Sequence, residues 1–190
     1  MGMDFTAYFS HDLSQDQIND LCKRLNCQKD QFPMTNRFVE DLLPHNPKDE
    51  IKEWRIDLDR IGGTSELFGP CGLSFTFSEK VCYFHHYIRW RAFLINDSIQ
   101  QELRYVCYEF RNSFRSSDVI YAPDNAARES AIMDFIGDDR NVDLSFIKNW
   151  LLVNCGPPKQ KIKDIYKEYE DYWVSEGYYI DDFKDFEVNS

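Results

Sequence analysis

Two adjacent histidines, His85 and His86, are the first residues whose type could support chemistry. Imidazole is the commonest metal ligand in proteins and titrates near neutral pH, so it can also act as a general base. The surrounding segment has the composition of a β-strand, in which adjacent side chains point to opposite faces. The two rings therefore cannot easily share a metal ion, and the sequence favours two structural or surface histidines.

Six cysteines form the second set of reactive side chains, at Cys22, Cys27, Cys71, Cys82, Cys107 and Cys155. No pair has the two-residue spacing of common zinc and redox motifs. Cys82 and Cys107 fall within apolar patterns that are typical of buried thiols. We therefore predict reduced, structural cysteines, with no metal site and no cofactor. A cysteine nucleophile with His85 or His86 as its base stays open as an alternative.

Asp124 and a short basic segment are two further candidates. Asp124 lies between a predicted strand and a predicted helix, where it could serve chemistry but is also a favoured helix-capping residue. Arg89, Trp90 and Arg91 interleave basic and aromatic groups that could hold an anion. Pairing of the arginines with the acidic part of the chain is the simpler interpretation.

The C-terminal segment, residues 161–190, is rich in acidic and aromatic side chains. Nine carboxylates and two lysines lie between residues 164 and 187. Tyr and Trp supply contact area at low entropic cost, and acidic groups attract a basic partner. The alternative is an ordinary final helix with a solvated outer face. The candidate partner-binding residues are Tyr169, Tyr172, Trp173, Tyr178, Tyr179, Asp181, Asp182 and Asp185.

The overall composition narrows the class of protein. A net charge of −11 argues against nucleic acid and anionic lipid as ligands and favours a basic protein partner. No window approaches the roughly 18 uninterrupted apolar residues that a membrane span needs. The first residues lack the pattern of a secretory signal, so we expect a cytoplasmic protein that does not cross a membrane.

Hydrophobic periodicity predicts the elements that must position these residues. Capping boxes start predicted helices at Ser14 and Ser98, and Asp143 can cap another. The predicted strands cover residues 3–9, 51–58, 73–77, 81–88 and 119–121, and the helices cover residues 15–25, about 38–43, 98–114, 126–136, about 144–153 and a last one from about 161. Strands come early and helices late, which predicts an α+β fold with a mainly antiparallel sheet and helices packed on one face. We expect residues 1–190 to form a single globular domain.

Three functions follow from these features as hypotheses. The first is a non-catalytic interaction domain, an adaptor or antidote-like protein, that presents its acidic, aromatic surface to a basic partner. The second is a small enzyme with a site assembled from His85 or His86, Asp124 and a cysteine. The third is a binding module in which Arg89 and Arg91 hold an anion beside Trp90. The absence of a recognised catalytic motif favours the first.

Overall fold

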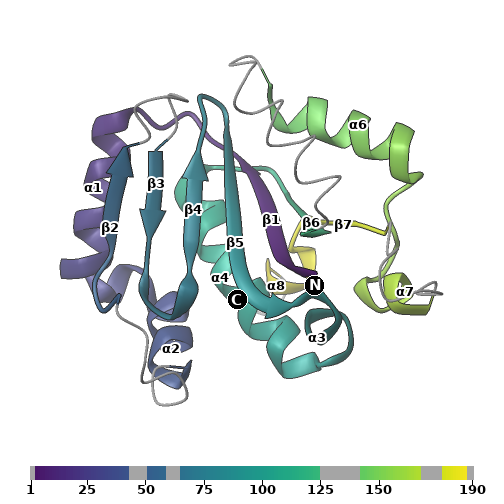
Figure 1. The fold of residues 1–190 in the computed structure, drawn as a ribbon, viewed down its shortest axis with the longest axis horizontal. Helices are drawn as coiled ribbons and strands as arrows, with labels where there is room; N and C mark the ends of the chain where they lie inside the picture. The colour runs from purple at the N-terminus through teal and green to yellow at the C-terminus, as the bar shows by residue number, and fades with distance from the viewer. Residues whose placement is uncertain (1–2, 43–50, 59–64, 125–141, 168–176, 188–190) are drawn as a thin grey trace.

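A computed structural model describes residues 3–42, 51–58, 65–124, 142–167 and 177–187. Seven strands form one antiparallel sheet in the order β2-β3-β4-β5-β1-β6-β7 (Figure 1). The strands are β1 (Asp4–Ser10), β2 (Arg55–Leu58), β3 (Ser65–Phe68), β4 (Ser74–Phe77), β5 (Val81–Arg89), β6 (Val119–Pro123) and β7 (Tyr179–Asp181). The helices of the described residues are α1 (Gln15–Cys27), α2 (Pro33–Leu42), α3 (Trp90–Ile95), α4 (Asp97–Phe114), α6 (Leu144–Cys155), α7 (Ile162–Lys167) and α8 (Lys184–Glu187). Short 3-10 turns lie at Lys29–Gln31 and Pro70–Gly72.

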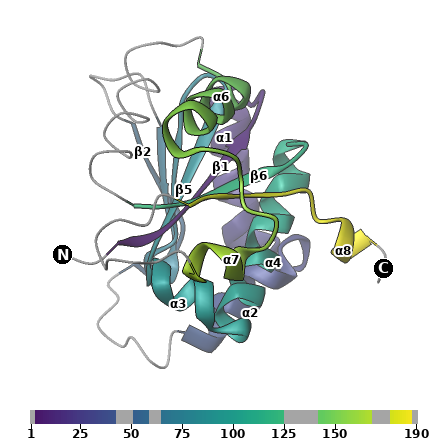
Figure 2. The same ribbon diagram turned by 90° about the vertical axis from the view of Figure 1, so that its right-hand side faces the viewer.

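The main core lies between the sheet and α1 to α4. Alternate residues of β1, among them Phe5 and Phe9, point to this side, where Phe110 and Phe114 of α4 meet them. The ring centroids of Phe75 and Phe110 are only 4.2 Å apart. Figure 2 shows α2, α3, α4 and α7 together on one side of the sheet. Burial of this aromatic surface is the main driving force for the fold.

A second, smaller core covers the opposite face of β1 and β6. Tyr8 and Ile120 point to this face and pack with Leu144, Ile147 and Leu151 of α6. Strand β1 is therefore buried on both faces, although its alternating pattern predicted a half-buried strand. Helix α6 is thus the element that lies across the sheet from α4.

The α+β fold and its mainly antiparallel sheet are confirmed. The Ser14 capping box is present at α1, and Asp143 caps α6 by accepting a hydrogen bond from the Phe146 amide. The cap of α4 is Asn96 rather than Ser98, because the Asn96 carboxamide accepts bonds from the Ser98 and Ile99 amides. The sequence patterns missed β3, α3 and α8 and left residues 178–180 unassigned. The predicted helix at residues 126–136 lies outside the described residues.

Among the described residues, no helix combines the length and apolar character that a membrane crossing would require.

Candidate functional site

The C-terminal segment folds back onto α4 through a partly buried arginine, Arg104, whose side chain is 14% exposed. Strand β7 pairs with β6, and this places Asp181 beside the middle of α4. The guanidinium of Arg104 donates two hydrogen bonds to Asp181, at 2.7 and 3.1 Å, and two to Asp185, at 2.9 and 2.8 Å. We call Arg104, Asp181 and Asp185 the arginine clasp. These hydrogen bonds hold residues 181–185 against α4.

The electrostatics of the clasp follow from its burial. Asp181 is 1% exposed, and it also accepts bonds from the Tyr121 hydroxyl and the Phe183 amide. Burial alone would lower the pKa of Arg104, but the hydrogen bonds that it donates to Asp185 and Asp181 outweigh burial and raise that pKa. The same bond from Arg104 lowers the pKa of Asp185. The pairing therefore favours the charged forms of Arg104 and Asp185.

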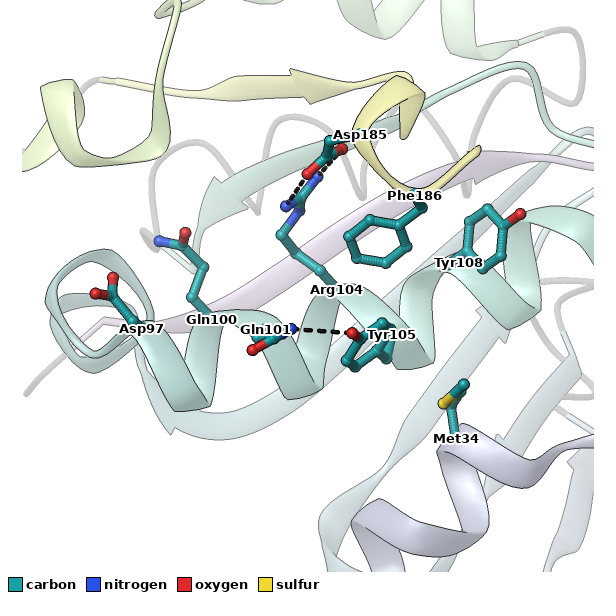
Figure 3. A pocket seen from close by; sticks show the side chains of 9 residues that line it. All are labelled: Met34, Asp97, Gln100, Gln101, Arg104, Tyr105, Tyr108, Asp185 and Phe186. Atoms are coloured by element: carbon teal, nitrogen blue, oxygen red, sulfur yellow. Dashed lines mark hydrogen bonds and ion pairs between the residues drawn. The ribbon is translucent and has the colours of Figure 1, made fainter. Parts of the chain in front are cut away.

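A pocket of about 570 Å³ opens beside the clasp, between α4, the start of α2, and α8 (Figure 3). Its aromatic lining consists of Tyr105, Tyr108 and Phe186, while Asp97 and Asp185 contribute carboxylates. The remaining lining residues are Met34, Gln100, Gln101 and Arg104. A smaller hollow of about 390 Å³ also borders Arg104, and lysines and carboxylates dominate its lining. The larger pocket therefore combines aromatic ring surface with two carboxylates, of which Asp185 is paired with Arg104 and Asp97 with Lys163 at 2.7 Å.

The rings of this pocket already contact guanidinium groups of the chain itself. Arg104 lies 4.7 Å from the centroid of the Phe186 ring, and Arg37 lies 5.2 Å from that of Tyr105. An aromatic face attracts a cation within about 6 Å through its quadrupole. The surface thus has the chemistry to accept further basic side chains.

The structure separates the predicted C-terminal contact residues into three groups. Tyr169, Tyr172 and Trp173 lie outside the described residues. Tyr178 and Asp181 are each 1% exposed, so neither offers a side chain to a partner. Tyr179, Asp182 and Asp185 reach the surface, with Asp182 bonded to the ammonium of Lys184 at 2.5 Å and Tyr179 stacked on Tyr121.

The predicted anion-binding trio does not converge on one ligand position. Trp90 is fully buried, with its ring 5.3 Å from that of Phe93, so it cannot stack on a ligand. The Arg89 guanidinium donates to Asp4 at 2.6 Å, whereas Arg91 contacts the Tyr166 hydroxyl at 3.4 Å. The two arginines therefore bond to different acceptors of the chain.

The two histidines point to opposite faces of the sheet, as the strand geometry predicts. His86 is fully buried, and its Nδ1 accepts a bond from the Ile88 amide. Its Nε2 therefore carries the proton and donates to the Cys71 carbonyl at 2.9 Å. Burial lowers the pKa of His86 to about 3, so its ring is neutral and structural.

His85 lies on the other face, beside two carboxylates. Its Nε2 is 3.8 Å from Oδ2 of Asp124, and Asp4 lies next to both. The structure thus brings together His85 and Asp124, two residues that the enzyme hypothesis combined. Within the described part of the chain, the group of ligand-type side chains around His85 contains no cysteine. Burial raises the pKa of Cys82 and of Cys107 well above the usual value, which makes both poor nucleophiles.

Of the residues that line the pocket, sequence reasoning named only Asp185 and missed the others. Tyr105 and Tyr108 lie three residues apart and share a helix face. That face is separate from the stripe of apolar residues that the core buries. Two tyrosines on an outward face, next to Arg104, were the available signal. Phe186 had no such signal, because its position depends on how α8 returns to α4.

Comparison of the chain with protein-family models, with curated proteins and with solved structures found no match.

Proposed function

We propose that this chain is a non-catalytic protein-interaction domain, adaptor- or antidote-like, that binds a basic protein partner in the cytoplasm. The observation that supports the proposal is the aromatic and acidic pocket between α4 and α8. The acidic C-terminal segment supplies one wall of this pocket, through Asp185 and Phe186. This surface would receive lysine or arginine side chains of the partner.

The aromatic and the acidic lining residues would contribute to binding in different ways. Tyr105, Tyr108 and Phe186 offer ring surface of the type that is enriched at binding hot spots. Asp97 is 76% exposed at the side chain, and with the net charge of −11 it would speed association with a basic surface. Exposed charges act mainly on the association rate and are screened by salt.

Affinity capture from native lysate with paired variants tests the proposal. Tyr105→Ala together with Tyr108→Ala should abolish capture of a basic protein, because two of the three rings that line the pocket are removed. Asp97→Lys together with Asp182→Lys should slow association. Asp20→Lys together with Glu53→Lys makes the same change in net charge near α1 and β2, at the other edge of the sheet, and should leave capture intact. Equal capture by all three variants would overturn the proposal.

The enzyme alternative retains one supporting observation, the contact between His85 and Asp124. A carboxylate beside an imidazole can orient it as a general base. A panel of ester, phosphoester and amide substrates, assayed with wild type and His85→Gln, tests this alternative. Turnover that is lost in His85→Gln would favour an enzyme, and turnover that the variant retains would come from elsewhere.

A further inference from the structure

Three strands bring Asp4, His85 and Asp124 to one face of the sheet. In the register of the sheet, Thr6 of β1 lies opposite His85 of β5 and opposite Ala122 of β6. Asp4 precedes Thr6 by two residues and Asp124 follows Ala122 by two, so both point to the same face as His85. The Asp124 amide also donates to the Asp4 carbonyl at 2.8 Å, which fixes the two backbones side by side.

The side chains then converge at the start of β1. One ligand-type atom from each residue lies within 4.8 Å of the other two. The side chains are partly buried, with exposed fractions of 18% for Asp4, 30% for His85 and 26% for Asp124. The three side chains are thus partly buried rather than fully extended into solvent.

A break in the strand register lies beside this group. The pairing of β1 with β5 shifts between Asp4 and Phe5, so that Asp4 lies opposite Arg89. Such bulges re-aim side chains and are common beside functional sites. The 2.6 Å bond from Arg89 orients the Asp4 carboxylate, as outer partners of metal ligands do.

We propose that Asp4, His85 and Asp124 form a binding site for a divalent transition-metal ion such as Mn²⁺. Two carboxylate oxygens and one imidazole nitrogen form a mixed donor set that suits Mn²⁺, Zn²⁺ or Co²⁺ better than an all-oxygen ion such as Ca²⁺. Three protein ligands leave coordination positions for water. The sequence indicated no metal because the three residues lie on separate strands, without a ligand spacing.

This site is independent of the α4–α8 pocket, so its test does not depend on the proposed function. Mn²⁺ is the suitable probe, because thiols such as that of the exposed Cys27 would compete for Zn²⁺. Electron paramagnetic resonance of free Mn²⁺ should show one ion bound per chain. His85→Gln and Asp124→Asn should each weaken binding by at least about tenfold, the smallest loss expected when a partner of a metal site is removed. Asp57→Asn, at the β2 edge of the sheet, is the control and should bind Mn²⁺ like the wild type.

A measurement on the wild-type protein covers the case in which a variant fails to fold. Bound Mn²⁺ should broaden the amide resonances of Thr6, His85 and Asp124 before all others, because paramagnetic relaxation falls steeply with distance. No saturable binding below roughly 1 mM, the weak limit for protein cation sites, would overturn the proposal. Broadening centred on the exposed carboxylates of the C-terminal segment would overturn it too.

Discussion

Replacing Arg104 with methionine should destabilise the protein far more than an ordinary surface substitution. Met keeps much of the side-chain volume and removes all four hydrogen bonds to Asp181 and Asp185. The Asp181 carboxylate, 1% exposed, then loses its cationic partner, and its remaining donors among the described residues are the Tyr121 hydroxyl and the Phe183 amide. Leaving one partner of a buried pair uncompensated costs about 3–5 kcal/mol.

The loss of the Asp185 contact adds little, since that side chain is 59% exposed and such pairs contribute up to about 1 kcal/mol. For a chain of this size, each kcal/mol lowers the melting temperature by about 2–4 °C. The expected fall is therefore roughly 6–20 °C. Urea unfolding followed by circular dichroism gives the free energy of unfolding directly.

Two further variants serve as controls for this prediction. Arg37→Met removes an exposed arginine whose ion pair with Glu102 has 45% and 31% exposed side chains, and it should cost about 1 kcal/mol or less. Adding Asp181→Asn to Arg104→Met removes the stranded charge, so the double variant should recover stability relative to the single one. A cost for Arg104→Met as small as that for Arg37→Met, or no recovery in the double variant, would refute the argument.

Three further predictions test the ionisation states and the second core. Arg104 lowers the folded-state pKa of Asp185, so ionised Asp185 stabilises the fold above the unfolded pKa of about 3.9, and this stabilisation is lost as the pH falls through the folded pKa. Asp185→Asn should therefore make the free energy of unfolding less sensitive to acid. Burial lowers the pKa of His86 to about 3, so below about pH 6.5 the unfolded state binds a proton that the folded state does not. The free energy of unfolding should therefore fall as the pH drops from about 6.5 towards 3. His86→Gln should reduce this slope, and NMR titration of the ring can check the pKa. Leu151 is fully buried and Leu152 is 50% exposed, so in urea unfolding Leu151→Ala should cost about 2–5 kcal/mol and Leu152→Ala about 0.5 kcal/mol or less. Similar costs for the two variants would show that α6 packs with another face.

Much of the local structure could be predicted because its causes are local. The α4 stripe, including Val106 and Phe110, repeats at the helical period, and all of its turns are buried together. The hairpin of β4 and β5 follows from alternation on both sides of a short turn. Val153, in contrast, is 82% exposed although it lies near the end of the apolar helix α6, because an apolar residue near a helix end need not face the core.

The candidate sites were predictable only in part. Strand alternation correctly placed His85 and His86 on opposite faces of the sheet. Only the structure showed that His86 is the buried and therefore less reactive of the two. The acidic segment was visible from composition, but composition could not show that Asp181 is buried while Asp182 is exposed. Arg104 and Asp181 are 77 residues apart, so no local pattern connects them.

The sequence alone determined the class of fold, the ends of several helices and the concentration of charge near the C-terminus, since periodicity, capping and composition act over a few neighbouring residues. Only the tertiary structure decided the strand order, the placement of α6 across the sheet from α4, and the meeting of Asp4, His85 and Asp124. Those features depend on pairings between strands that are distant in the sequence. Each such pairing depends on the whole sheet and core, not on any one segment.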